Sequence, residues 1–257
     1  MTYYNPFDIS GKTAFVTGSS RGIGLTLAGG LARSGCQVVL HGLDRPGVER
    51  ARDELVAATG AKVHAFSFDV TDADSVTQGV ADILAGVGPI DILVNSAGIQ
   101  RRAPFVDFAV SDWNAIVAVN LTGAFLVAQQ VSKAMIAQGG GKIVNIGSVQ
   151  SQLARPGITP YAATKGAIVM LTKGLCAELA GHGIQANALA PGYIATDLTR
   201  TLVADEQFSS WVRGRTPAGR WGEVEDLVGT LLYLVSPAAD FVNGQVVYVD
   251  GGMTSVV

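Results

Sequence analysis

Tyr161 and Lys165 are the pair of residues whose types and spacing most directly predict chemistry in this sequence. They lie four positions apart at the start of a helical pattern, so on a helix both side chains share one face. A free tyrosine has a pKa near ~10 and is a poor base at neutral pH. A neighbouring ammonium favours the phenolate and lowers that pKa, which suits proton transfer to or from an alcohol oxygen. An amphipathic surface pair with the same spacing is the alternative when the pair is considered alone.

Ser148 is the second candidate, because it follows the short apolar run Lys142–Ile146. That position would place it at the carboxyl edge of a parallel sheet, where open α/β folds bind ligands, and its hydroxyl could hold a substrate oxygen. A nucleophilic serine would need a histidine partner. The three histidines (His41, His64 and His182) form no Ser–His–Asp arrangement and no metal-ligand spacing, so the sequence predicts no metal site.

A glycine-rich turn, Thr17-Gly18-Ser19-Ser20-Arg21-Gly22-Ile23-Gly24, lies between the first apolar run and a helical pattern. A pyrophosphate must approach the backbone N–H groups at a helix N-terminus, and a Cβ there would block it. The spacing is Gly-x-x-x-Gly-x-Gly rather than the general Gly-x-Gly-x-x-Gly. A simple strand-to-helix turn would explain the glycines alone, but their place in the first βα turn favours a dinucleotide site.

The end of the second apolar run bears on the choice of cofactor. An NAD site is expected to hold the ribose 2′-hydroxyl with an acid about 20 residues after the glycine turn. Gly42 and Leu43 stand there instead, and Asp44 follows slightly later. The missing acid and the nearby Arg21 favour NADP(H) over NAD(H), whereas Asp44 favours NAD(H). Leu43 cannot bind a phosphate, so a dual-cofactor enzyme stays open.

Short apolar runs alternate with longer helical patterns along the chain. The runs are Thr13–Thr17, Gln37–His41, Lys62–Phe68, Ile90–Asn95, Lys142–Ile146, Ile184–Ala190 and Gln245–Val249. The helical patterns include Gly22–Ser34, Asp72–Ala85, Ser111–Ala137, Tyr161–Gly181 and Glu223–Val235. This alternation predicts an α/β fold: a single Rossmann-type domain over 1–257, with a doubly wound parallel sheet and helices on both faces. The least regular stretch, 191–222, is either a lid over the site or an ordinary helical excursion.

Composition excludes several classes of protein. The 257 residues are 48% hydrophobic and 15% charged, which is enough apolar material for one sizeable core and excludes a disordered chain. The net charge is −3 and the basic residues are scattered, so nucleic-acid binding is not expected. The sequence shows no signal-peptide pattern and no apolar run approaching the ~20 residues of a membrane span. We therefore expect a cytoplasmic protein without a membrane partner.

Together these motifs resemble the short-chain dehydrogenase/reductase family over essentially the whole chain. The resemblance rests on Thr17–Gly24, on Asn95–Gly98 with Ser96 in place of the family's second Asn, on Pro191-Gly192, and on a tetrad of Asn120, Ser148, Tyr161 and Lys165. It implies an NAD(P)(H)-dependent oxidoreductase that moves a hydride between a nicotinamide and an alcohol carbon.

The resemblance also implies a role for each member of the tetrad. Tyr161 would be the acid/base, Lys165 would lower the Tyr161 pKa and bind the nicotinamide ribose, and Ser148 would polarise the substrate oxygen. Asn120 would shape a helix kink that holds a relay water. Judged from the residues alone, Asn120 could equally be a satisfied buried amide in an apolar run.

The expected cofactor contacts follow from the same motifs. Asp69, after the third strand, could hydrogen-bond the adenine edge, while Thr71 or Asp72 fits a helix cap better. The full set is Gly18, Ser20, Arg21, Gly22, Ile23, Gly24, Leu43, Asp69, Val70, Asn95, Ala97, Gly98, Tyr161, Lys165, Pro191, Gly192, Ile194 and Thr196. The resemblance further implies a homotetramer, whereas the sequence alone shows only apolar helices and a C-terminal strand available for self-association.

Within the family the chain is most similar to the gluconate 5-dehydrogenases. The similar stretches are Gly98–Phe105, Ser148–Ser151, Tyr161–Lys165, Thr216–Gly222 and Phe241–Gly244. This similarity implies a sugar-acid substrate and the interconversion of D-gluconate and 5-keto-D-gluconate.

Four residues are expected to bind the sugar acid. Arg101 and Arg102 would pair with the carboxylate, and Gln150 and Arg155 would bind hydroxyls; each could instead be a surface or inter-subunit residue. A 3-oxoacyl-thioester or general ketone reductase on the same scaffold is the alternative, and the two arginines favour the acid. A sensor that binds nucleotide without chemistry is a third reading, which the intact tetrad disfavours.

Overall fold

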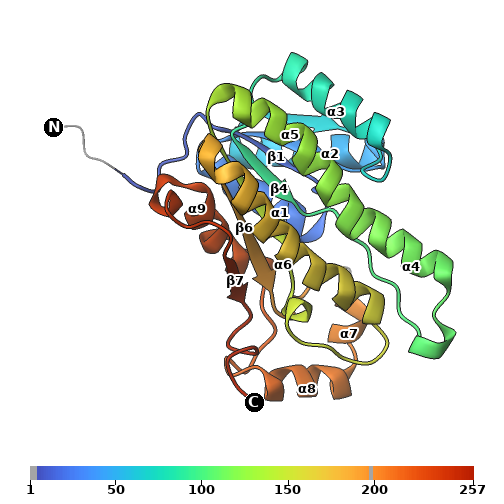
Figure 1. The fold of residues 1–257 in the computed structure, drawn as a ribbon. Coiled ribbons are helices and arrows are strands. Elements are labelled where there is room, and N and C mark those ends of the chain that lie inside the picture. The colour runs from blue at the N-terminus through green and yellow to red at the C-terminus, as the bar shows by residue number, and fades with distance from the viewer. Residues whose placement is uncertain (1–4, 197–198) are drawn as a thin grey trace.

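The structure, a computed structural model, describes residues 5–196 and 199–257 and confirms the predicted doubly wound sheet (Figure 1). The strands form one parallel sheet in the order β3-β2-β1-β4-β5-β6-β7. Their bounds are β1 Thr13–Val16, β2 Gln37–His41, β3 Val63–Phe66, β4 Ile92–Asn95, β5 Gly141–Ile146, β6 Ile184–Pro191 and β7 Val246–Val249. The order reverses beside β1, and open α/β sheets bind ligands at such a switch point.

Helices cover both faces of the sheet. One layer consists of α1 (Gly22–Arg33), α2 (Arg45–Thr59) and α9 (Val228–Val235), and the other of α3 (Ala73–Gly86), α5 (Ala124–Gln138) and α6 (Thr159–Leu179). Three further helices, α4 (Val110–Val117), α7 (Arg200–Val203) and α8 (Glu206–Arg215), lie at the edges of these layers (Figure 1). Of these helices, the sequence patterns did not predict α2, whereas α7 and α8 lie in the stretch 191–222, for which a helical excursion was one of the two alternatives.

Alternate residues of each strand supply the two cores. On β1, Ala14 and Val16 face the layer of α1, while Phe15 faces the layer of α3 and α5, and all three are fully buried. Because both faces are covered, the strand is apolar from Ala14 to Val16 without alternation, as the sequence shows. On α2 only Val48, Ala51 and Leu55 are buried. This narrow apolar stripe explains why periodicity did not reveal the helix.

The predicted long helix Ser111–Ala137 is divided into α4 and α5 by a π-helical turn, Ala118–Gly123. By length and composition, the combined helix Val110–Gln138 could cross a membrane. Polar residues interrupt this helix, so it contains no continuous apolar run of membrane-spanning length. In the structure Val127, Val131 and Met135 are fully buried against the sheet, so these residues belong to the core.

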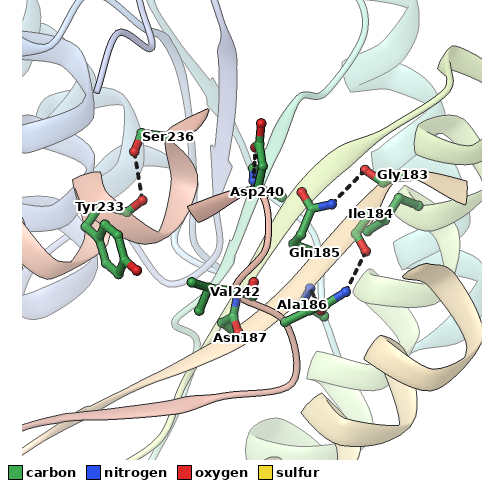
Figure 2. A network of polar contacts seen from close by, with 11 residues as sticks. Gly183, Ile184, Gln185, Ala186, Asn187, Tyr233, Ser236, Asp240 and Val242 are labelled. Atoms are coloured by element: carbon green, nitrogen blue, oxygen red, sulfur yellow. Dashed lines mark hydrogen bonds and ion pairs between the residues drawn. The ribbon is translucent and has the colours of Figure 1, made fainter. Parts of the chain in front are cut away.

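The loop before β7 is held against β6 by polar contacts (Figure 2). The Asn187 amide donates to the Val242 carbonyl at 2.7 Å and accepts from the Gln245 N–H at 3.0 Å. These bonds fix the register in which Val249 pairs with Pro191, so that the carboxyl ends of β6 and β7 lie together.

We expect Gly30→Ala to destabilise the protein, because α1 and α9 approach each other closely at Gly30. A Cβ at this position would lie 2.5 Å from Cγ1 of Val228. Overpacking of this kind costs about 1–3 kcal/mol and exceeds the gain of about 1 kcal/mol in helix propensity. Denaturant unfolding measures the difference, with Gly214→Ala on α8 as control, where a Cβ has nothing within 4 Å. A Gly30→Ala protein as stable as the Gly214→Ala protein would contradict this packing.

Candidate active site

A cavity of about 520 Å³ opens at the carboxyl edge of the sheet. Small-molecule sites commonly have volumes of roughly 300–1,000 Å³. Eighteen predicted site residues line it: Gly18, Ser20, Arg21, Gly22, Ile23, Gly24, Leu43, Gly98, Arg102, Ser148, Gln150, Arg155, Tyr161, Lys165, Pro191, Gly192, Ile194 and Thr196. The segments that follow β1, β2, β4, β5 and β6 therefore converge on one site, as parallel strands require.

Four of the predicted cofactor residues lie behind the cavity wall and support it: Asp69, Val70, Asn95 and Ala97. Thr17 Oγ1 accepts from the Ala97 N–H at 3.1 Å, and a Cβ on Gly18 would lie 2.6 Å from the Ala97 Cα. The Asn95 amide donates to Asn145 Oδ1 at 3.0 Å, so it ties β4 to β5. Val70 packs in the core beside Gly123. The Asp69 carboxylate accepts from the Thr71 N–H at 2.8 Å.

In the turn after β3, Asp69 and Asp72 have different roles, as their hydrogen bonds show. The Asp72 side chain accepts from the Ser75 N–H at 2.7 Å and caps α3, which confirms it as the better cap. Asp69 does not line the cavity, and its carboxylate is engaged by Thr71, so its expected adenine contact has no geometric support.

Arg101 and Arg102 are adjacent but point to different places. Arg101 pairs with Asp112 of α4 and does not line the cavity, whereas Arg102 does. Neighbouring residues of an irregular loop need not share a direction, so sequence could not decide which of them faces the site. Arg101 therefore has no geometric support as a carboxylate ligand.

Lys165 is buried at the centre of the site. Its ammonium donates to the Ile146 carbonyl, at the end of β5, at 2.6 Å and lies 5.6 Å from the centre of the Tyr161 ring. Burial lowers the pKa of Lys165 to about 8. The amine is therefore partly neutral at slightly alkaline pH.

The pKa of Tyr161 is raised, which differs from the lowered value that the Tyr–Lys pair alone predicts. Burial of the phenol is the largest cause; a hydrogen bond with Ser148 lowers the pKa, and Tyr193 raises it. The ammonium of Lys165 lies over the ring and is itself easily neutralised, so it does not overcome the burial. A protonated Tyr161 is suited to donate its proton to a carbonyl oxygen.

Asn120 occupies the π-helical turn and is buried. Its amide donates to the Ile99 carbonyl at 2.9 Å and accepts from the Ile99 N–H at 2.8 Å. Asn120 is therefore a satisfied buried amide and also part of a helix irregularity. The two interpretations of this residue, a buried amide and a residue at a helix kink, are compatible. The bonds hold the loop after β4, where Ile99 lines the cavity.

The glycine turn fits a dinucleotide. Gly22 begins α1 at φ +58° and lines the cavity, and a Cβ there would meet nothing within 4 Å, so the backbone faces open space. Open backbone N–H groups at a helix start suit a pyrophosphate. At Gly42, directly after β2, a Cβ would lie 2.8 Å from Cγ2 of Val48. An acidic side chain that binds the ribose of NAD is expected at this position, and the contact with Val48 leaves little room for one.

His41 and Tyr193 are two site residues that sequence reasoning did not assign. Nδ1 of His41 accepts from the Gly18 N–H at 3.4 Å, and its Nε2 lies 2.9 Å from the Phe68 carbonyl. Burial lowers the pKa of His41 to about 4, so a neutral ring supports the glycine turn. Tyr193 lines the cavity directly after Pro191 and Gly192, and its place at the end of β6 was the available signal.

With fold and site in place, the chain belongs to the short-chain dehydrogenase/reductase family, and it is an oxidoreductase that acts on a CH–OH group. A family model described as enoyl-(acyl carrier protein) reductase matches residues 18–254. The gluconate 5-dehydrogenase of Gluconobacter oxydans is 55% identical over 254 residues, or 99% of each chain. The 5-keto-D-gluconate 5-reductase of Escherichia coli K12 is 47% identical over 96% of this chain and 97% of its own.

A solved structure agrees with these relatives. The crystal structure of a gluconate 5-dehydrogenase from Burkholderia cenocepacia J2315, in complex with NADP and tartrate, matches with a TM-score of 0.93. It is 54% identical and covers 98% of both chains. The predicted family and fold are thus confirmed.

We expect the stability of the protein to report the low pKa of Lys165. The folded state releases this proton near pH 8 and the unfolded chain only near the ordinary 10.5. The buried ammonium therefore destabilises the folded protein by a constant amount below about pH 8, and the free energy of unfolding rises as the pH increases from 8 to 10.5. The full change is up to about 3 kcal/mol. Unfolding of the wild type and of Lys165→Met, followed from pH 7 to 10.5, isolates the effect. A stability difference between the two proteins that stays constant with pH would contradict it.

Proposed function

We propose that this protein is a gluconate 5-dehydrogenase that interconverts D-gluconate and 5-keto-D-gluconate, with NADP(H) preferred. The observation that carries the proposal is that a catalytic set of residues and a pair of arginines line the same cavity. Ser148, Tyr161 and Lys165 supply the chemistry of an alcohol carbon, and Arg102 and Arg155 supply positive charge for an acid. Two relatives, 55% and 47% identical to this chain, are named for gluconate or its 5-keto form, which supports the proposal.

In this proposal the residues that line the cavity divide between cofactor and substrate. NADP, when bound, would supply the hydride chemistry at its nicotinamide. The glycine turn from Gly18 to Gly24 would hold its pyrophosphate, and Pro191 and Gly192 would hold its nicotinamide end. Lys165 anchors α6 to β5 through the Ile146 carbonyl and would also hold the nicotinamide ribose.

The protein's own groups handle the proton at the reacting oxygen. Ser148 holds the substrate oxygen beside Tyr161, with which it shares a hydrogen bond. During reduction Tyr161 donates its proton to the carbonyl oxygen as the alcohol forms. During oxidation the same phenolic oxygen takes the proton back, after it has been deprotonated.

The preference for NADP(H) is supported at the outer end of the cavity. Arg21 lines the wall and is exposed, whereas Asp44, which would favour NAD(H), is not part of the wall. Gly42 offers no acid to the ribose. A guanidinium is a strong partner for a 2′-phosphate.

A 3-oxoacyl-thioester reductase is the second candidate, because the matching family model carries the description of an acyl reductase. Two guanidiniums at the substrate end disfavour it, since an acyl chain would leave both without a partner.

We also propose a cytoplasmic homotetramer in which 191–222 acts as a lid. Exposed apolar residues on α5 and α6, Phe125 at 44% and Met170 at 63%, offer faces for association. Thr199 and Leu202 of the 191–222 segment line the cavity, as a lid requires. Both cofactors are cytoplasmic metabolites, which supports the location.

The function is tested by following reduced nicotinamide at 340 nm with purified protein. We expect turnover of gluconate with NADP exceeding that with NAD, and 5-keto-D-gluconate reduction with NADPH. Tyr161→Phe keeps the ring and removes the proton donor, so turnover should fall by about 10²–10⁴ while NADP binding changes little. Activity confined to a 3-oxoacyl ester would overturn the sugar-acid assignment, and near-normal turnover by Tyr161→Phe would overturn the role of the phenol.

A further inference from the structure

Tyr193 is held in place by aromatic contacts. Its ring packs edge-on against Phe208, Trp211 and Trp221, with centroid distances of 5.7, 5.6 and 5.7 Å. Phe208 and Trp211 belong to α8. The cluster therefore fixes Tyr193 between the end of β6 and α8, and its hydroxyl has a defined direction.

The Tyr193 hydroxyl meets two donors. Nε2 of Gln150 donates to it at 3.5 Å, and the guanidinium of Arg155 is near enough to lower its pKa. The hydrogen of the Tyr193 hydroxyl is available to another acceptor. Burial, the largest influence, raises the pKa of Tyr193, so the phenol keeps that hydrogen at neutral pH.

Two positive charges stand beside this hydroxyl. Burial and the charge of Arg155 lower the pKa of Arg102, which shows that the two guanidiniums act on each other. Within residues 5–196 and 199–257, no carboxylate forms an ion pair with either. Arg155 also lies 5.4 Å over the Phe208 ring, which holds it in position.

Two buried polar atoms at the same place have no partner among the described residues. They are Nε of Arg155 and Oε1 of Gln150, whose side chain is only 8% exposed. Buried polar atoms are nearly always satisfied, so these two indicate a ligand that offers both an acceptor and a donor. A carboxylate with a neighbouring hydroxyl has this chemistry.

We propose that Tyr193 determines substrate specificity by completing an anion subsite with Arg102 and Arg155 that takes the carboxylate of the sugar acid. The Gln150 oxygen accepts a hydrogen bond from a hydroxyl next to that carboxylate. One negative charge between the two guanidiniums removes their repulsion, and the Tyr193 O–H gives a third donor. This inference rests on the proposed function and names the group of the substrate that is recognised.

The subsite should reject the neutral analogue of gluconate. D-Glucitol carries CH₂OH where gluconate carries its carboxylate, so it would leave both cations without a counter-charge. Sites built for a polar group discriminate strongly against analogues that lack it, because their own buried groups then stay unpaired.

The test compares kcat and KM for D-gluconate and D-glucitol in the wild type and in Tyr193→Phe, which keeps the aromatic cluster. We expect the gluconate-to-glucitol ratio of kcat/KM to fall at least about 10-fold, through a higher KM for gluconate. Arg213→Gln on α8 is the control, since Arg213 is exposed and pairs with Glu206. An unchanged ratio in Tyr193→Phe would overturn the proposal.

Binding without turnover separates this proposal from the proposed function. Trp113→Phe leaves Trp211 and Trp221 as the tryptophans, and both contact Tyr193. In this background, gluconate and tartrate should change the fluorescence saturably in the presence of NADPH, and glucitol should not. Carboxylate-selective binding without gluconate turnover would contradict the function and keep the subsite. Gluconate turnover with equal binding of glucitol would contradict the subsite and keep the function.

Discussion

The buried ammonium of Lys165 connects the two elements on which the site depends. Its hydrogen bond to the Ile146 carbonyl joins α6, which carries Tyr161, to β5, which precedes Ser148. Burying a charge is costly even with one hydrogen bond, and the pKa of Lys165, lowered to about 8 by burial, reflects that cost. The unfavourable burial of this charge occurs where proton transfer requires the Tyr161 phenol and the Ser148 hydroxyl to be held in fixed positions. The Ser151 hydroxyl adds to the same junction by donating to the Lys165 carbonyl at 2.8 Å.

The rest of the site is positioned by backbone groups at the carboxyl ends of the strands. Asn120 holds the loop after β4 through Ile99, and a neutral His41 holds the glycine turn through the Gly18 N–H. Each of these polar side chains satisfies a backbone group that the irregular edge would otherwise leave unpaired. The same contacts that stabilise the edge of the sheet therefore also shape the cavity.

The strands, the glycine turn and the Tyr161–Lys165 pair each have a local pattern: apolar runs, glycine spacing, and residues four apart on a helix. Ser148 was indicated by its place after a strand, and Asn120 by the family resemblance alone. The π-helical turn at Asn120 could not be predicted from the residues alone, since no local pattern distinguishes it from a continuous helix. The directions of Arg101 and Arg102 depend on an irregular loop. The raised pKa of Tyr161 depends on burial by segments far away in the sequence, and Tyr193 becomes a site residue only when α8 packs against it.

In the proposed function this site removes a hydride from carbon 5 of gluconate while Tyr161 handles the proton of the attached hydroxyl. D-Gluconate carrying deuterium at carbon 5, incubated with the protein and NADP, tests it most directly. Mass spectrometry of the products should find the deuterium in the reduced cofactor and none in the keto acid. Keto acid that retains the deuterium would show oxidation at another carbon and would contradict the account.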